Sequence, residues 1–427
     1  MNFYIHTFGC KVNQYESEYI ALLLENSGFK RVFEPKADII IINSCTVTST
    51  GDNKACKYMR RMRRENPDSV IVLTGCMTQA FPDEDYPEAD IVLGNYSRKQ
   101  VADAVSRFLI SHTKIVDIKP HKATKGEAFE PMAISRDEEH TRAFVKIEDG
   151  CNRFCSYCII PYARGRVRSK SIEDLKEEIQ GLAESGYKEI VLVGINLSCY
   201  GQDIGLTLCD AVECACAAEG IERVRLSSLE PELMDDEAIK RLAKQEKLCP
   251  QFHLALQSGS TSVLKRMNRH YTAEEYLRIA ETLKREFDNC ALTTDIMTGF
   301  PGETEQEHKE SMAFAEKIGF ARVHCFSYSR RPGTVADKME NQLDNGLKNR
   351  RCNEMIAATD KLKKEFLKSQ IGLTQTVIAE KYINGVHSGY TPNYTLVKFS
   401  SPKDICGQTV KVKLTKAFDD YVEGKLC

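Results

Sequence analysis

The sequence lacks the features that mark secreted and membrane-embedded proteins. Residues 1–8 contain neither a basic segment nor the long apolar core of a secretion signal. The aliphatic runs are short, and the four isoleucines at residues 39–42 are far too few to cross a bilayer. Excess charge is also missing, since the net charge is −2, so any nucleic acid would have to bind to local basic patches. We therefore expect a cytoplasmic protein with no membrane partner.

The chain is instead rich in cysteine, with 17 residues of this type, an odd number. Without a secretion signal, disulfide bonds are not expected, and metal-bound thiolates in a reducing compartment are favoured. At 427 residues the chain is long enough to form two or three domains, each with a buried core of its own.

Residues 151–158 carry the most specific motif, Cys-Asn-Arg-Phe-Cys-Ser-Tyr-Cys. The thiolates of Cys151, Cys155 and Cys158 can bind three corners of a 4Fe–4S cluster and leave its fourth iron without a protein ligand. A cluster that binds a substrate or cofactor needs such an open iron, whereas one that only carries electrons does not. A zinc site is one alternative, although zinc normally takes a fourth ligand, and a set of free buried thiols is another.

Patterns of apolar residues divide the chain into parts. Over residues 1–115, short apolar runs alternate with helical patterns, which predicts an α/β domain with a parallel, Rossmann-like sheet. The expected strands are residues 3–8, 38–42, 69–74 and 90–93, and the expected helices are residues 13–26 and 50–65. Residues 116–139 are charged, contain proline and show no clear period, so we interpret them as a linker.

Residues 140–370 contain six apolar runs, each followed by a loop and usually a helix, which predicts an open, partial (βα)6 barrel. The expected strands are residues 142–147, 189–193, 223–227, 252–256, 291–297 and 322–327. Residues 371–427 change to short alternating strands separated by turn residues, which predicts a small β-barrel. Its clearest strands are residues 376–380, 395–399 and 409–414.

Three further cysteines, Cys10, Cys45 and Cys76, stand shortly after the first three expected strands. Because the carboxyl ends of parallel strands share one edge of a sheet, these thiols should converge and could bind a second 4Fe–4S cluster with one open iron. Three small, buried cysteines are the alternative. The other cysteines share no ligand spacing and are interpreted as structural: Cys56, Cys199, Cys209, Cys214, Cys216, Cys249, Cys290, Cys325, Cys352, Cys406 and Cys427.

Polar residues and glycines follow the expected barrel strands, at the face where barrels bind ligands. Glycines let the backbone approach a cofactor closely, and amide, hydroxyl and carboxylate groups can bind ribose hydroxyls and an amino group. The candidates for cofactor contact are Tyr157, Gly194, Asn196, Ser228, Glu230, Gln257 and Gly299.

Together these motifs resemble the methylthiotransferase branch of the radical S-adenosylmethionine (SAM) superfamily over essentially the whole chain. The matching segments are residues 7–10 with Asn13 and Glu18, and residues 43–45, 74–76, 151–158, 161–165, 253–260 and 299–303. The resemblance implies a methylthiotransferase domain that holds an auxiliary 4Fe–4S cluster, a radical SAM core that binds SAM at its own 4Fe–4S cluster, and a C-terminal RNA-binding barrel of the TRAM type.

Residues 158–169 are most similar to enzymes that act on N6-threonylcarbamoyladenosine in tRNA and add a methylthio group at C2 of this adenine, beside the anticodon. The hydrogen at that carbon is neither acidic nor easily displaced, so the reaction calls for radical chemistry from a cofactor rather than acid–base groups. The family implies SAM and two 4Fe–4S clusters as cofactors. It also implies the anticodon stem-loop of tRNA as substrate and flavodoxin or ferredoxin as the type of electron donor.

The contacts to RNA are less sharply marked in the sequence. Arg164, Arg166 and Arg168 follow the SAM-type cysteine motif and are candidates for phosphate contact. In the C-terminal barrel, Lys381, Tyr390 and Tyr394 are candidates for phosphate contact and base stacking, although aromatics in so small a barrel could equally form its core. A basic run on the second expected helix is interpreted as a solvated face: Lys57, Arg60, Arg61, Arg63 and Arg64.

Two kinds of alternative remain open at this point. Within the same family, the acceptor could be isopentenyladenosine in tRNA or an aspartate on a ribosomal protein. In another class, the chain could be a two-cluster electron carrier. Cleavage of SAM to deoxyadenosine under strong reductant separates a radical enzyme from a carrier.

Overall fold

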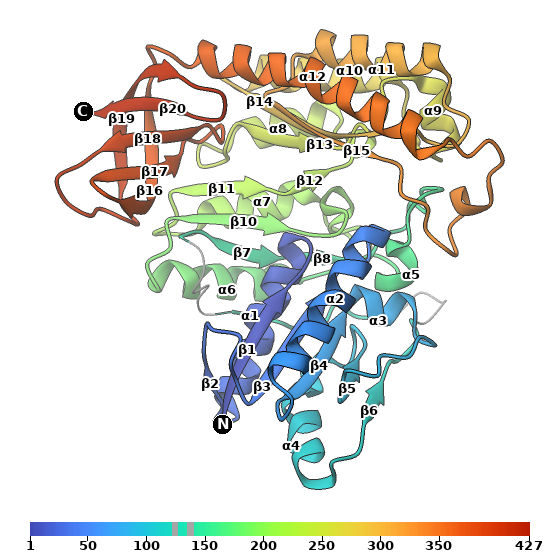
Figure 1. Cartoon of the computed structure of the whole chain (residues 1–427). Coiled ribbons are helices and arrows are strands. Elements are labelled where there is room, and N and C mark those ends of the chain that lie inside the picture. Colours follow the sequence, from blue (N-terminus) through green and yellow to red (C-terminus); the bar gives the residue numbers. More distant parts are fainter. Residues whose placement is uncertain (122–126, 135–140) are drawn as a thin grey trace.

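The computed structural model describes residues 1–121, 127–134 and 141–427. The N-terminal unit lies below the central unit in Figure 1, and a small barrel lies beside the central unit. The N-terminal unit is a six-stranded, all-parallel sheet in the order β2-β1-β3-β4-β5-β6. Its strands are β1 (Asn2–Thr7), β2 (Lys30–Arg31), β3 (Ile39–Ser44), β4 (Val70–Gly75), β5 (Ile91–Leu93) and β6 (Ile115–Asp117). Its helices are α1 (Lys11–Asn26), α2 (Ser49–Glu65), α3 (Cys76–Ala80), η1 (Arg98–Gln100) and α4 (Val101–Ser111).

The central strand β3 shows why helices cover both faces of this sheet. Ile39 and Ile41 pack against α1 and α4, while Ile40 and Ile42 pack against α2 on the opposite face. All four side chains are fully buried. A continuous aliphatic run is typical of a strand buried on both faces of a parallel sheet, and the predicted sheet is confirmed.

The central unit consists of two parallel half-sheets, β11-β10-β7 and β12-β13-β14-β15. Their strands are β7 (Ala143–Lys146), β10 (Glu189–Val193), β11 (Arg223–Leu226), β12 (Ser228–Leu229), β13 (Gln251–Leu254), β14 (Ala291–Thr298) and β15 (Arg322–Ser327). The third predicted strand is interrupted at Ser227, whose N–H donates to the carbonyl oxygen of Leu192 in β10 at 3.0 Å. The next residue, Ser228, pairs with His253 in β13, so the chain changes neighbours at this point.

Helices cover the outside of both half-sheets, and a short two-stranded ribbon of β8 (Glu148–Asp149) and β9 (Arg168–Ser169) flanks them. The α-helices are α5 (Ile160–Arg164), α6 (Ile172–Glu184), α7 (Leu208–Ala217), α8 (Asp236–Ala243), α9 (Thr261–Arg266), α10 (Ala273–Glu286), α11 (Glu305–Ile318) and α12 (Asn345–Ser369). The single-turn 3-10 helices are η2 (Leu197–Cys199), η3 (Pro231–Leu233) and η4 (Ala336–Lys338).

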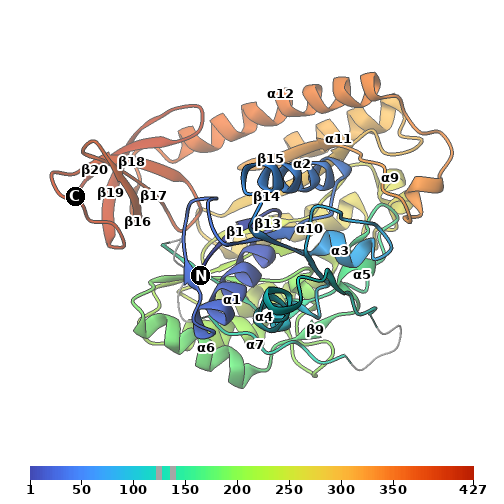
Figure 2. The ribbon, with the colours of Figure 1, turned by 60° about the horizontal axis from the view of Figure 1, so that its bottom comes forward.

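The C-terminal unit is a closed five-stranded barrel, β16-β17-β18-β20-β19. Its strands are β16 (Thr374–Ile383), β17 (Val386–Tyr390), β18 (Leu396–Ser400), β19 (Thr409–Ala417) and β20 (Val422–Leu426). Three of these strands were expected from the sequence, and β17 and β20 complete the barrel. Figure 2 shows α12 running along the outer side of the central unit to the barrel.

Part of the predicted linker is packed between the two larger units. Residues 122–126 and 135–140 lie outside the described residues. Ile115–Asp117 forms the edge strand β6 of the N-terminal sheet. Met132 and Ile134 are only 3% and 4% exposed, and the hydroxyl of Tyr15 in α1 donates to the carbonyl oxygen of Met132 at 2.8 Å. The described residues 127–134 therefore pack into the junction.

None of the helices within residues 1–121, 127–134 and 141–427 is long and apolar enough to cross a membrane.

Truncating the centre of β3 tests this layered core. Ile41→Ala should lower the free energy of unfolding of the N-terminal unit by about 2–5 kcal/mol, because it opens a cavity between the sheet and α1. Urea unfolding followed by circular dichroism measures the loss. The matched control is Ile110→Ala, since Ile110 is 85% exposed and its truncation should change stability by no more than about 0.5 kcal/mol. Equal losses in both variants would contradict the assignment of the core.

Candidate active site

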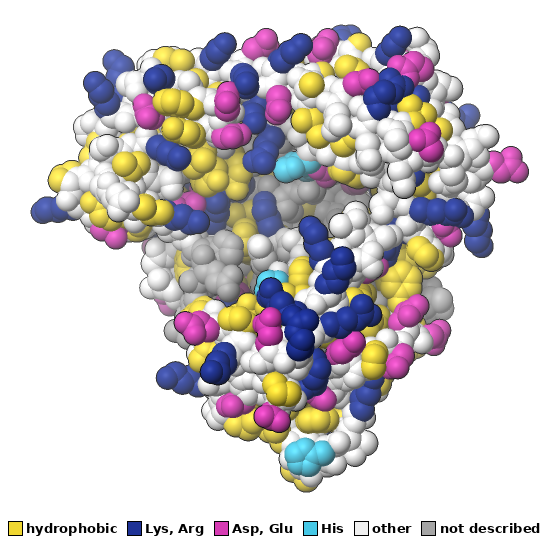
Figure 3. Space-filling view, viewed as in Figure 1, with side chains coloured by type: hydrophobic (Ala, Val, Ile, Leu, Met, Phe, Trp, Pro, Cys, Tyr) yellow, Lys and Arg dark blue, Asp and Glu magenta, His cyan; other side chains and the backbone are white. Residues whose placement is uncertain are grey.

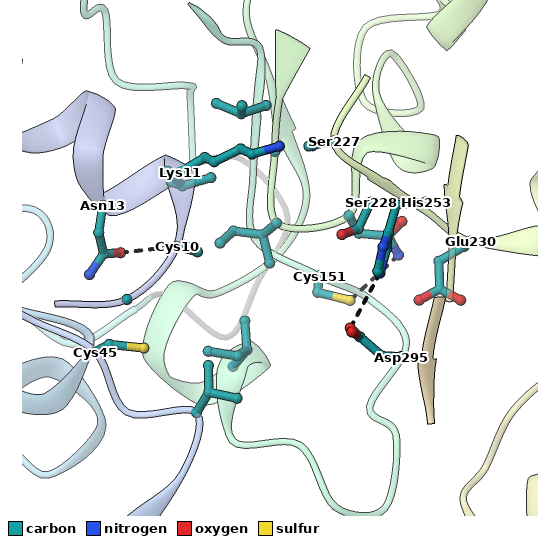
Figure 4. Close-up of a pocket in the computed structure, with 18 of the residues that line it drawn as sticks. Cys10, Lys11, Asn13, Cys45, Cys151, Ser227, Ser228, Glu230, His253 and Asp295 are labelled. Atoms are coloured by element: carbon teal, nitrogen blue, oxygen red, sulfur yellow. Dashed lines mark hydrogen bonds and ion pairs between the residues drawn. The ribbon is translucent and has the colours of Figure 1, made fainter. Parts of the chain in front are cut away.

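A cavity of about 930 Å³ lies between the N-terminal unit, the central unit and the barrel. Both predicted cysteine triads line it: Cys10, Cys45, Cys76, Cys151, Cys155 and Cys158. Figure 4 shows Cys10 and Cys45 on one side of this space and Cys151 on the other. Residues that are more than 140 positions apart in the sequence therefore share one chamber.

The central triad is carried by the loop that joins β8 to α5. Gly150 precedes the first cysteine at φ +87°, and an added Cβ would lie 2.0 Å from the carbonyl oxygen of Arg166, so only glycine fits there. Asn196 Nδ2 donates to Cys151 Sγ at 3.7 Å, and Arg269 donates to Cys155 Sγ at 3.3 Å. These donors partly compensate the negative charge of bound thiolates.

The second triad stands where β1, β3 and β4 end. Cys10 occupies the N-cap of α1, and Cys76 is the first residue of α3. Gly9 has φ +104°, and an added Cβ there would lie 2.9 Å from Cys45 Sγ. Asn13 Oδ1 accepts from Cys10 Sγ at 3.8 Å and lies 4.0 Å from Cys76 Sγ, so one amide faces two of the three sulfurs. The predicted convergence of these strand ends is confirmed by the geometry.

Both triads suit iron–sulfur clusters better than a single ion. Within the described part of the chain, neither triad brings its three sulfurs within 4.8 Å of one another, as ligands of one metal ion would be. A cubane presents separate irons to its thiolates, so wider spacing fits it. Burial raises the pKa of both Cys76 and Cys151 to about 12. Iron binding must therefore displace the thiol protons.

Arg164 holds the second triad against the central unit. This fully buried side chain donates through Nε to Cys76 Sγ at 3.1 Å and through Nη2 to Asn13 Oδ1 at 2.7 Å. It also forms ion pairs with Glu16 at 2.5 Å and Asp149 at 3.4 Å. One guanidinium thus joins a cysteine of the N-terminal unit to the ribbon strand β8.

Glu16 is the centre of the buried ionic cluster at this junction. Besides Arg164, it pairs with Arg98 at 2.5 Å and with Lys146 at 2.7 Å, and Lys146 also reaches Asp149 at 2.6 Å. Burial alone would raise the pKa of Glu16, but the three cations hold it below its usual value. Each charge is compensated inside the protein, as buried charges require.

Two predicted RNA contacts are corrected by this arrangement. Arg164 is buried in the ionic cluster, and Arg168 is 5% exposed and pairs with Glu127 and Asp149. Neither side chain is free to bind a phosphate. Arg166 remains exposed, with its guanidinium 4.6 Å from the ring centre of Phe154. It stays a candidate for RNA contact.

Six of the seven residues predicted to contact the cofactor line the cavity: Tyr157, Gly194, Asn196, Ser228, Glu230 and Gln257. Asn196 Oδ1 and Gln257 Oε1 are buried and have no hydrogen-bond partner among the described residues, which leaves them for a bound ligand. Gly299 does not line the cavity. An added Cβ there would lie 2.5 Å from Cγ of Lys348, so this glycine instead permits the close approach of α12.

Comparisons with known proteins agree with this geometry. Residues 145–315 match the model of the radical SAM superfamily, and residues 2–94 match that of the uncharacterized protein family UPF0004. The threonylcarbamoyladenosine tRNA methylthiotransferase MtaB of Bacillus subtilis (strain 168) is 39% identical over 98% of this chain and 95% of that protein. The MtaB of Thermotoga maritima is 38% identical over 99% of this chain and 98% of that protein.

The chain belongs to the radical SAM methylthiotransferase family. A tRNA-2-methylthio-N(6)-dimethylallyladenosine synthase of Finegoldia magna is also similar, at 37% identity over 96% of this chain and 91% of that protein. The solved structure of the radical SAM methyltransferase TsrM from Kitasatospora setae shares the fold, with a TM-score of 0.57 and 12% identity over 84% of this chain and 89% of that one.

Membership in the family makes this chain a methylthiotransferase with SAM and 4Fe–4S clusters as its cofactors. Asn196 and Gln257, whose buried side-chain oxygens have no partner among the described residues, line the same cavity as the Cys151, Cys155 and Cys158 triad. The second triad shares that cavity, which is what transfer between two sites requires.

Sequence reasoning missed the cationic residues of this methylthiotransferase cavity. Lys11, Arg142 and Arg225 line it, and no motif marked them. Burial, together with the nearby charges of Arg225 and Arg142, lowers the pKa of Lys11 to about 8. The position of Lys11 directly after Cys10 was the one sequence signal that could have revealed it.

The predicted RNA-contact residues of the barrel divide into two groups. Tyr390 and Tyr394 are stacked, with ring centres 4.4 Å apart, and Tyr394 lines the cavity. Arg142 lies over both rings, 4.9 Å and 5.1 Å from their centres. They therefore face the junction with the central unit. Lys381 is exposed on the outer surface of β16.

Substitutions at Arg164 and at Arg166 provide a matched test of the ionic cluster. Arg164→Met should lower the free energy of unfolding by about 3–5 kcal/mol, because Glu16 and Asp149 lose the cation that they share in a buried site. Arg166→Met removes an exposed guanidinium and should change stability by no more than about 0.5 kcal/mol. Urea unfolding of both variants makes the comparison. A stable Arg164→Met variant would show that the cluster does not hold the junction.

Proposed function

We propose that this methylthiotransferase modifies C2 of N6-threonylcarbamoyladenosine next to the anticodon of tRNA. The observation that carries the proposal is the single cavity that both cysteine triads line. The two MtaB relatives, at 39% and 38% identity, are named for this nucleoside. The Finegoldia relative, at 37%, is named for dimethylallyladenosine, which makes that nucleoside the second candidate.

The residues of the chain bind and orient the reactants. SAM bound at the central cluster supplies a deoxyadenosyl radical that can take hydrogen from an unactivated carbon. Asn196 and Gln257 present buried oxygens to the ligand at that site. Glu230 is held in place by an ion pair with Arg269, which also donates to Cys155 Sγ.

The exposed basic face of α2 is the surface that best fits the RNA backbone. Figure 3 shows Lys and Arg side chains gathered over α2, at the edge of the hollowed centre of this face. The exposed cations of α2 are Lys54, Lys57, Arg60, Arg61 and Arg64. Cys45 and Val47, which precede α2, line the cavity, so RNA bound along this helix would reach the site directly.

The barrel offers a second RNA surface on its outer side. Phe418 and Tyr421 are stacked, with ring centres 4.7 Å apart. Lys416 lies over the ring of Phe418, and Lys398 lies over the ring of Tyr421. Stacked aromatics with adjacent lysines suit unpaired bases and phosphates. We assign the RNA-binding role of a TRAM-type domain to this barrel, together with Lys381. We further propose that flavodoxin or ferredoxin donates the electron and that the enzyme works in the cytoplasm, where tRNA is found.

Mass spectrometry of tRNA nucleosides tests the assignment of the acceptor. Expression of this chain in a bacterial strain lacking its own enzyme of this type should restore 2-methylthio-N6-threonylcarbamoyladenosine and deplete its precursor. Product that appears only on the dimethylallyl nucleoside would contradict the proposal and support the second candidate.

Cysteine variants serve as controls for that experiment. Cys10→Ala should abolish the methylthio product while SAM is still cleaved to deoxyadenosine, whereas Cys151→Ala should abolish both. An electron carrier would form no deoxyadenosine even without substitution.

Charge reversal on α2 tests the RNA surface. The double variant Lys54→Glu with Lys57→Glu should weaken tRNA binding at low salt and reduce the salt dependence of log Kd by about 2, because two phosphate contacts are lost. Filter binding over a range of salt concentrations measures both effects. Lys309→Glu is the control, since Lys309 is exposed on α11 in the outer helix layer. If this control weakens binding as much, α2 has no special role.

A further inference from the structure

One wall of the cavity is built from cations that the chemistry of the two cysteine triads does not use. They are Lys11 from α1, Arg142 from the segment just before β7, and Arg225 from β11. Figure 4 shows the Lys11 side chain extended across the cavity toward Ser227. Its ammonium group has neither a hydrogen bond nor an ion pair with any residue that the structure describes.

The carboxylates near this wall do not balance its charge. Glu189 pairs with Arg142 at 3.6 Å, Arg223 at 3.6 Å and Arg225 at 3.0 Å, and Glu380 pairs with Arg142 at 3.2 Å. The wall cations Lys11, Arg142 and Arg225, counted with Arg223, which shares Glu189 but does not line the cavity, therefore make four cations for two carboxylates. An excess of positive charge in a partly closed cavity favours an anionic ligand.

Aromatic rings hold two of these cations without neutralising them. Arg142 lies over Tyr390 and Tyr394, and Arg225 lies 4.7 Å from the ring centre of Tyr394. Cation–π contact fixes a guanidinium in place while its charge stays available to an anion. Tyr394 belongs to the barrel, so all three units of the protein contribute to this wall.

Ser227 provides an independent sign that a ligand binds here. Its side chain lines the cavity, is 9% exposed, and its Oγ has no hydrogen-bond partner among the described residues. It occupies the interruption between β11 and β12, where the chain changes neighbours. A buried hydroxyl without a partner is costly unless a ligand satisfies it.

We propose that Lys11, Ser227 and Arg142 form a subsite for the free carboxylate of the threonyl group on the substrate nucleoside. This inference rests on the proposed function and adds to it the residues that determine which modified nucleoside is accepted. Lys11 and Arg142 supply charge, and Ser227 supplies a hydroxyl donor. A dimethylallyl group has no charge, so it would leave the half-buried ammonium group of Lys11 without a partner in this subsite, which disfavours it.

Binding of two matched RNAs tests the subsite. The probes are anticodon stem-loops that carry N6-threonylcarbamoyladenosine, one with the free carboxylate and one with that carboxylate converted to the amide. The cluster-loaded enzyme should bind the acid at least about 10-fold more tightly, as expected for a charge-assisted contact. Lys11→Gln should reduce this ratio to below about 2. Ser227→Ala should reduce it about threefold, as expected for one hydrogen bond.

The control is Lys36→Gln, which removes an exposed lysine of the same unit and should retain the full ratio. Iron content and the absorption spectrum show whether each variant keeps both clusters. Ser227→Ala provides the second measurement, because Ser227 is not adjacent to a cysteine of either triad.

The outcomes separate the subsite from the proposed function. Unchanged acid-to-amide ratios in both Lys11→Gln and Ser227→Ala would overturn the subsite even if the threonylcarbamoyl nucleoside is methylthiolated. Methylthiolation of the dimethylallyl nucleoside alone would instead overturn the proposed function.

Discussion

The buried ionic cluster around Glu16 is the interaction on which the rest of this site depends. Its members come from α1, η1, β7, β8 and α5, so it joins the sheet that carries one cysteine triad to the core that carries the other. Arg164 also donates to Cys76 Sγ, so the ionic cluster holds a cysteine of the second triad in place as well as the junction between the units. A purely apolar interface would fix the relative orientation of the two units less strictly, because hydrogen-bonded ion pairs depend on direction and apolar contacts do not.

Much of the architecture could be predicted because its signals are local. The isoleucine run of β3 marks a strand buried on both faces, and thiols directly after β1, β3 and β4 must meet at one edge of a parallel sheet. Asn196, Ser228, Glu230 and Gln257 could be predicted at the cavity in the same way, since each stands just after a strand expected from the sequence. The strand at residues 223–227 was harder, because its interruption at Ser227 depends on which neighbour accepts each backbone group.

Side-chain roles that depend on distant partners could not be predicted in this way. Arg164 and Arg168 follow a cysteine motif in a basic run, which is typical of phosphate contact, yet their partners are Glu16 and Asp149. Glu16 is 148 positions from Arg164 in the sequence. The predicted cofactor contact at Gly299 was wrong for a similar reason, since this glycine allows the close packing of α12, which is distant in the sequence. Lys11 becomes informative only when β11 and the barrel are seen to close the same cavity.

The helix α12 determines how firmly the barrel is held against the rest of the protein. It has 25 residues, which corresponds to a rod about 37 Å long, and it packs against the core before it enters the barrel. Arg223 and Arg225 in β11 donate hydrogen bonds to Thr376, Tyr390 and Pro392 of the barrel, so the core holds the barrel directly as well as through α12. If the barrel binds RNA as proposed, this rigid attachment would keep the bound nucleotide at a high effective concentration near the cavity, which a flexible tether of equal length would lower.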